Sequence, residues 1–279
     1  MHWLQTRKRT SPRPARARFI VLGKAPLLAV AFVAALGVMA AAIGFPAAAS
    51  ASAATRQLPI YSVERDQKVC AISFDAAWGA DNTQAILDVL AKYNVPATFF
   101  VVGNWADQYP EQVKAIVESG NELHNHSDAH DHYNSLSAEE IIADVTSCND
   151  KIEALTGVRP TLIRCPYGEY DDHVIAAIRS MGMEPIQWDV DSLDWKDISA
   201  AEITKRVVGK VGPGSIVLFH NAGLHTPEAL PAILEQLLQE GYTFVPISKL
   251  LLGGTYGVDY TIDHTGRQFA VKGRSEQET

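Results

Sequence analysis

The chain has few cysteines and none in a spacing that would build a metal or redox centre. Only Cys70, Cys148 and Cys165 occur among 279 residues, and no CxxC pair is present. An odd count of three excludes a multi-bridge disulfide framework. We expect Cys70 and Cys148 to be buried as small apolar residues. Cys165 as a thiol nucleophile is set aside, because no histidine is paired with it.

Positive charge is also scarce beyond the first 24 residues. Those residues carry seven Lys and Arg and no acid, whereas the whole chain has a formal net charge of −8. Removing the seven positive charges leaves about −15 for the remainder. Nucleic-acid binding needs basic surface that displaces counterions, and anionic lipid attracts basic surface in the same way. The charge therefore argues against both partners and is compatible with a neutral glycan.

The basic start precedes an apolar run over residues 25–49 and small residues in an A-x-A spacing at 49–53. This order is typical of an export signal. The apolar run approaches the ~20 residues that span a bilayer. The alternative to a cleaved signal is therefore that the segment is kept as a membrane anchor, with its basic end on the cytoplasmic side. A buried helix over 27–43 is disfavoured by the dense basic flank. We predict a signal peptide or N-terminal membrane anchor over 1–53 and an extracytoplasmic remainder, which is secreted, wall-associated or anchored.

Short β-type runs then alternate with amphipathic helical patterns, and no GxGxxG follows the first run. This alternation indicates a parallel sheet covered by helices. We expect an α/β fold, a distorted or incomplete (β/α) barrel of about seven parallel strands, over residues 68–252. Residues 54–67 are expected to be a linker and 253–279 a flexible tail. The expected strands cover residues 69–74, 97–102, 121–124, 162–165, 185–190, 215–219 and 243–247.

Unusual polar side chains fall at the ends of five of these strands, and carboxyl ends of parallel strands carry functional groups. Each has an ordinary structural alternative. Asp75 and the two acids of 191–195 are frequent helix or loop caps, and a lone histidine such as His220 is more often structural. His126 and His130 lie four residues apart, and paired imidazoles suit zinc, cobalt or nickel. A solvated polar loop is the competing explanation for that pair, and the helical HExxH signature is absent.

Five segments, in order, resemble the motifs of the NodB-homology polysaccharide deacetylases, carbohydrate esterase family 4. They are SFDAAWG (73–79), HSDAH (126–130), RCPYG (164–168), DSLDW (191–195) and LFH (218–220). The resemblance covers roughly residues 68–252. The first motif and FHNAGLHTPEALP (219–231) are similar to the sporulation-type branch of Gram-positive bacteria.

The resemblance implies a hydrolase that removes N-acetyl groups from amino sugars, with one divalent ion, zinc first and cobalt or nickel as alternatives. It implies the following roles: Asp75 as general base, His126 and His130 as metal ligands, Arg164 as the holder of the base, His220 as general acid, and Asp191 as the carboxylate that orients His220, with Asp194 as second candidate. For the substrate it implies an oxyanion contact from the Tyr167 N–H and acetyl-pocket walls at Trp195 and Leu218.

One position departs from the family pattern. The second aspartate of the first motif, a metal ligand in the family, corresponds to Ala76. Asp81 or water is the favoured replacement ligand, and Asp75 itself or His124 are further options. The remaining possibility is that nothing replaces this ligand, so that metal binding is poor and activity is low or lost.

Three functions follow from this pattern. The first is a metal-dependent deacetylase of N-acetylglucosamine or N-acetylmuramic acid in peptidoglycan. The second is a catalytically impaired protein that binds wall glycan on the same fold. The third is a deacetylase or deformylase of a small or lipid-linked acylated sugar.

Overall fold

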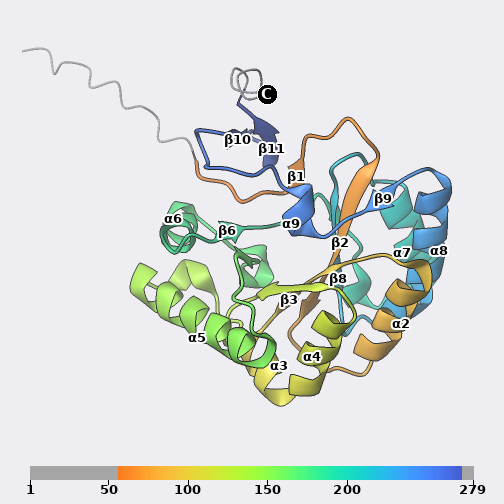
Figure 1. The fold of residues 1–279 in the computed structure, drawn as a ribbon, viewed down its shortest axis with the longest axis horizontal. Coiled ribbons are helices and arrows are strands. Elements are labelled where there is room, and N and C mark those ends of the chain that lie inside the picture. Colours follow the sequence, from red (N-terminus) through yellow and green to blue (C-terminus); the bar gives the residue numbers. More distant parts are fainter. Residues whose placement is uncertain (1–55, 272–279) are drawn as a thin grey trace, which may run out of the picture. The chain divides into compact units, whose positions relative to one another are not determined.

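The computed structural model describes residues 56–271, and their fold is a curled parallel sheet surrounded by helices (Figure 1). The sheet order is β6-β5-β4-β3-β2-β8-β7, with β9 beside β2 and every neighbouring pair parallel. The strands are β2 (Val69–Ala76), β3 (Thr98–Val101), β4 (Glu122–Asn125), β5 (Leu162–Ile163), β6 (Glu184–Pro185), β7 (Val190–Asp191), β8 (Ile216–His220) and β9 (Thr243–Phe244).

The connection between the two edge strands explains why the sheet curls. β6 and β7 lie at opposite edges, yet only residues 186–189 separate them. Seven flat strands spaced ~4.8 Å apart would put those edges ~29 Å apart. The chain from 185 to 190 reaches at most ~18 Å. The edges must therefore approach each other, which confirms the incomplete barrel. The single strand expected over 185–190 is wrong, because the chain there crosses from one edge to the other.

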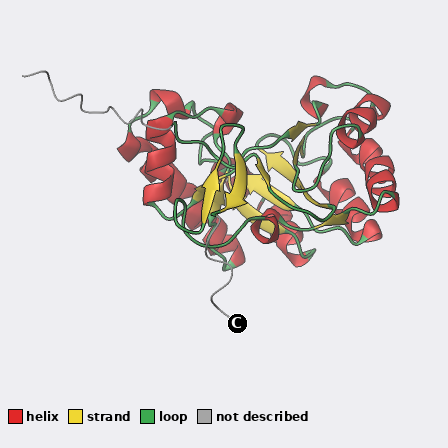
Figure 2. Ribbon diagram, turned by 90° about the horizontal axis from the view of Figure 1, so that it is seen from above, coloured by secondary structure: helices red, strands yellow, loops and turns green. Residues whose placement is uncertain are grey.

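Helices lie around the sheet, as Figure 2 shows in a second view. The helical patterns of the sequence correspond to helices here, and α5 begins with a capping box, in which Ser137 and Glu140 bond each other's backbone. This box satisfies two of the N–H groups that a helix start leaves free. The helices are α2 (Thr83–Tyr93), α3 (Gly103–Gln108), α4 (Pro110–Glu118), α5 (Ala138–Thr156), α6 (Asp172–Ser180), α7 (Ala200–Val208), α8 (Thr226–Gln239) and α9 (Ile247–Leu250).

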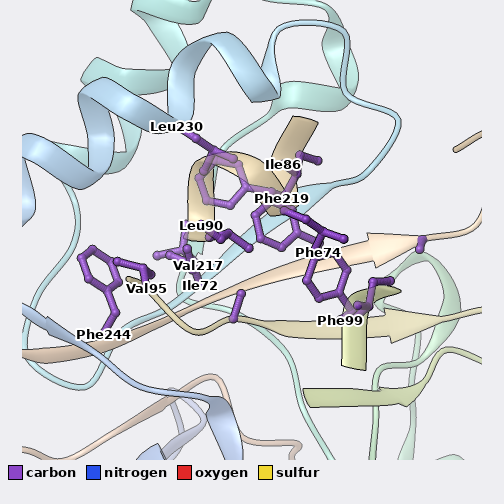
Figure 3. Packing of buried hydrophobic residues seen from close by; sticks show 14 of the residues in the cluster. Ile72, Phe74, Ile86, Leu90, Val95, Phe99, Val217, Phe219, Leu230 and Phe244 are labelled. Atoms are coloured by element: carbon purple, nitrogen blue, oxygen red, sulfur yellow. The ribbon is translucent and has the colours of Figure 1, made fainter. Parts of the chain in front are cut away.

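The main hydrophobic core fixes the two central strands. The Phe74 ring of β2 stacks on Phe99 of β3 at 4.9 Å and on Phe219 of β8 at 5.5 Å between ring centroids. Ile86 of α2 and Leu230 of α8 belong to the same buried cluster (Figure 3). Each fully buried ring contributes roughly 1.5–3 kcal/mol of transfer free energy. The strands that carry Asp75 and His220 near their carboxyl ends are thus fixed by the hydrophobic core.

The described parts of the expected linker and tail are folded, which corrects both expectations. β1 (Ser62–Val63), β11 (Arg267–Ala270) and β10 (Tyr260–Ile262) form a second sheet in that order. Ile60, Val63 and Tyr260 are buried in a shared cluster. The two segments cover each other's apolar residues, which neither could do alone. The expected export segment, 1–53, lies outside the described residues.

The three cysteines are buried and unpaired, as expected for Cys70 and Cys148. Burial raises the pKa of each thiol, to about 12 for Cys70 and Cys165. Nucleophilic thiols have depressed pKa values, so this result supports leaving Cys165 out of the chemistry.

Candidate active site

The carboxyl ends of the strands surround a cavity of about 700 Å³. This volume falls within the range of small-molecule sites. Every residue predicted for the site lines this cavity except Arg164, which is fully buried and bonds Asp75. The lining includes Asp75, His126, His130, Tyr167, Asp191, Trp195, Leu218 and His220. The five motif segments therefore meet at one cavity, as their positions at strand ends predicted.

Asp75 is held by Arg164 at the floor of the cavity. The Arg164 Nη1 atom donates to Asp75 Oδ1 over 2.7 Å, and Nη2 donates to the Ser73 hydroxyl and the Gln187 carbonyl. The guanidinium lies 4.2 Å from the centroid of the Phe100 ring. Burial by itself would raise the pKa of Asp75, but the charge of Arg164 is the largest of the causes that outweigh it, and the pKa is lowered. Asp75 is consequently an ionised carboxylate at neutral pH.

His126 has a tautomer fixed by its surroundings. Its Nδ1 lies 2.7 Å from the Arg164 carbonyl oxygen, which can only accept, so Nδ1 carries the hydrogen. Nε2 then faces Asp75 Oδ2 at 3.6 Å. Burial lowers the pKa of His126 despite the nearby Asp75 charge. The ring is neutral at pH 7 with a lone pair on Nε2, the state in which histidine binds metal.

His130 lies beside His126, with ring centroids 5.0 Å apart. Burial, and then the His126 ring, lower its pKa to about 4. Its backbone is in the left-handed region at φ 61°, and its N–H donates to the Ser127 hydroxyl. Its Nδ1 atom is buried without a hydrogen-bond partner. The structure thus supplies two neutral imidazoles to one side of the cavity.

The described residues do not complete a metal site around this pair. A catalytic zinc ion takes three protein ligands, and no group of three His, Cys, Asp or Glu side chains in residues 56–271 is placed to hold an ion. Ala76 packs in the hydrophobic core. Asp81, the favoured replacement, is exposed and absent from the lining. His124 instead lies against Phe100 and 3.7 Å from Glu122.

His220 is oriented by Asp194. Its Nδ1 lies 2.8 Å from Asp194 Oδ1, and Asp194 Oδ2 accepts from the His220 N–H and the Thr226 hydroxyl. Burial would lower the pKa of His220, but the hydrogen bond and charge of Asp194 outweigh it and raise the pKa. The assignment of Asp191 to this role is wrong, because its Oδ1 accepts from the Leu193 N–H. Asp194, the second candidate for this role, holds the His220 imidazole.

Tyr167, Trp195 and Leu218 all line the cavity, as predicted. Leu218 is buried, whereas the other two side chains are exposed. The Tyr167 ring stacks on His132 at 4.2 Å. The oxyanion contact of the Tyr167 N–H and the acetyl-pocket walls stay predictions.

Backbone strain is concentrated in the loops around the cavity. Six non-glycine residues of the described chain have a positive φ, and five belong to these loops. Such conformations cost on the order of 1–3 kcal/mol each and cluster at functional sites. The five are Ser127, His130, Tyr167, Leu193 and Asp197.

Sequence reasoning missed two residues here. Thr226 lies in the segment 219–231 and was given no role, although its hydroxyl bonds Asp194 over 2.6 Å. Trp78 lies within the first motif and was given no role, yet it lines the cavity and is mostly exposed. A tryptophan three residues after Asp75, just past the end of the same strand, was the available signal.

The fold and these paired acid and base groups define a hydrolase-type barrel site. A sequence model described as polysaccharide deacetylase matches residues 62–186. The chain is 34% identical over 184 residues to the peptidoglycan-N-acetylglucosamine deacetylase of Bacillus cereus, covering 64% of this chain and 67% of that protein. The chain belongs to the polysaccharide deacetylase family, carbohydrate esterase family 4.

Two other similar proteins are named differently, one as a deacetylase of another sugar and one as a pseudoenzyme. The peptidoglycan-N-acetylmuramic acid deacetylase PdaC of Bacillus subtilis is 38% identical over 189 residues, which is 68% of this chain and 40% of PdaC. The chain thus spans less than half of that relative. A pseudoenzyme of the same family from Bacillus anthracis has 34% identity and a TM-score of 0.67, covering 69% of this chain and 68% of that one. A mutant of it is described as having restored enzymatic activity.

Proposed function

We propose that this protein hydrolyses the N-acetyl groups of amino sugars in cell-wall glycan. One observation carries the proposal: an ionised carboxylate and an imidazole with a raised pKa occupy register-paired positions, Asp75 on β2 and His220 on β8, beneath one cavity. Groups whose environments separate their pKa values in this way are suited to act as base and acid. The names of the related peptidoglycan deacetylases support the substrate class.

The proposed reaction needs two proton transfers. Asp75 accepts a proton from water while the water oxygen attacks the acetamide carbon. Protonated His220 then donates to the nitrogen as the C–N bond breaks, which yields acetate and the free amine. Arg164 holds the base and Asp194 holds the acid. Positioned acid–base groups of this kind contribute roughly 10²–10⁴-fold each.

We further propose zinc as the ion that His126 and His130 bind, with cobalt or nickel as alternatives. Two neutral imidazoles support this, and the absent third ligand predicts weak binding. No step of the reaction above is assigned to the ion.

A second function is favoured by a specific observation. Ala76 occupies the position of a family metal ligand and is buried in the core, and a similar protein is described as a pseudoenzyme. A catalytically impaired protein that binds wall glycan would keep the cavity and lose turnover. The intact Asp75–Arg164 and His220–Asp194 pairs favour the hydrolase, because binding alone needs neither.

An extracytoplasmic location remains a proposal that rests on the sequence of residues 1–53. Within residues 56–271 no helix has the length and apolar character needed to cross a membrane.

The decisive experiment measures acetate released by the purified protein from peptidoglycan and from N-acetylglucosamine oligomers. Each reaction is run with chelator and with added zinc or cobalt. Release that is lost in Asp75→Asn and in His220→Ala establishes the hydrolase. No release under any condition from a folded protein that still binds the glycan rejects it in favour of the impaired binding protein.

A further inference from the structure

Exposed aromatic side chains are concentrated at the cavity. Only four are exposed among the described residues: Trp78 at 60%, Trp195 at 55%, Tyr167 at 54% and Tyr256 at 38%. The first three line the cavity. Large apolar rings left in water at one place mark a binding surface. All three stand in the motif segments, but the family resemblance gives a role to Trp195 and Tyr167 and none to Trp78.

Trp78 begins a continuous aromatic surface on one side of the cavity. Its ring lies 4.7 Å from His130, whose ring lies 4.5 Å from Tyr167. Tyr167 in turn stacks on His132 at 4.2 Å. Because the neighbouring rings hold the indole in place, little side-chain freedom is lost when a ligand stacks on it. The apolar C–H face of a pyranose ring fits the flat face of the Trp78 indole.

Carboxylates are in excess around the cavity. Asp75, Asp191 and Asp197 line it together with protonated His220, and no Lys or Arg of the described chain does. Arg164 compensates Asp75 from behind. Asp191 and Asp197 form no ion pair within the described residues, and Asp194 matches the charge of protonated His220. Lys196 lies over the Trp195 ring, outside the lining.

We propose that this cavity selects an uncharged N-acetylhexosamine whose ring stacks on Trp78, and that it rejects a muramic acid residue with a free lactyl carboxylate. The inference rests on the proposed function and narrows its substrate. Carboxylates several ångströms apart at a protein surface repel enough to weaken binding about tenfold. The expected preference is therefore for N-acetylglucosamine units, unlike that named for PdaC.

The test compares two tetrasaccharides by isothermal titration calorimetry with the full chain in chelator. One contains only N-acetylglucosamine, and the other contains N-acetylmuramic acid without peptide. We expect about tenfold tighter binding of the first. Asp197→Asn should narrow this difference. Trp78→Ala should weaken binding of the neutral tetramer about tenfold, whereas Trp78→Phe should keep most of it.

Tyr256→Ala is the matched control, because it removes an exposed ring remote from the cavity lining. Circular dichroism checks that each variant is folded. Equal or tighter binding of the muramic acid oligomer, or unchanged binding by Trp78→Ala, overturns the inference. Trp78-dependent binding of the neutral tetramer without acetate release from any substrate supports it while rejecting the hydrolase.

Discussion

The Asp194 carboxylate accepts three hydrogen bonds, two of them from His220. It lies 2.8 Å from both the backbone nitrogen and Nδ1 of His220, and 2.6 Å from the Thr226 hydroxyl. The carboxylate is fully buried. Three donors satisfy it, and they fix the imidazole with its other nitrogen free for a substrate.

Asp194→Asn should lower kcat/KM by roughly 10²–10⁴-fold, because the variant removes the charge that favours protonated His220. Acetate release measures the effect. Asp191→Asn is the matched control and should change activity only a few-fold, since Asp191 lines the cavity without touching His220. An equal loss in both variants would contradict the assignment.

The sequence could not separate these two acids. They lie three residues apart, and both precede Trp195. What distinguishes them is the backbone at Leu193, whose φ of 56° reverses the chain and directs Asp194 inward. The leucine at this position does not predict a left-handed turn, because leucine seldom adopts that conformation. The sheet type, in contrast, follows from the alternation of β-type runs with helical patterns, and the five motifs were found by their resemblance to a family.

The pH profile should show an alkaline limb set by His220. Its pKa is raised by the hydrogen bond and charge of Asp194, which outweigh burial. Since the proposed donor is protonated His220, kcat/KM should fall as pH rises through a value above the ~6.5 of free imidazole. Asp194→Asn should move this limb to lower pH.

The same shift affects stability. A raised folded-state pKa stabilises the protein fully below the unfolded pKa, ~6.5, and this contribution is lost as pH rises through the folded pKa. Urea midpoints across that range measure it. If the alkaline limb of kcat/KM keeps its position in Asp194→Asn, a group other than His220 controls that limb.

Arg164→Met should destabilise the fold by about 3–5 kcal/mol, because it leaves the buried Asp75 carboxylate without its cation. The midpoint and slope of urea unfolding measure the change. Arg159→Ala is the control: this exposed arginine bonds Asp150 and Glu153 at the surface, and the loss should be ~1 kcal/mol or less. Similar losses in both variants would refute a special role for the buried pair.

The segment after residue 252 shows a second limit of sequence reasoning. Its strands have three and four residues, too few for a clear alternation. β11 pairs with β1, about 200 positions earlier in the chain. Local composition contains no information about such a distant partner, so a folded segment reads as a polar tail.

Tyr260→Ala should therefore be costly although it lies in the expected tail. Its ring is buried with Ile60 and Val63, and removing a buried aromatic ring costs about 3–5 kcal/mol. Tyr260→Phe separates packing from hydrogen bonding: it removes only the bond to Glu184 and should cost ~1 kcal/mol. Val258→Ala, at an exposed neighbouring position, should change stability by less than ~0.5 kcal/mol. If Tyr260→Ala unfolds at the same urea concentration as Val258→Ala, the second sheet contributes nothing to the stability of the barrel and the expectation of a flexible tail is restored.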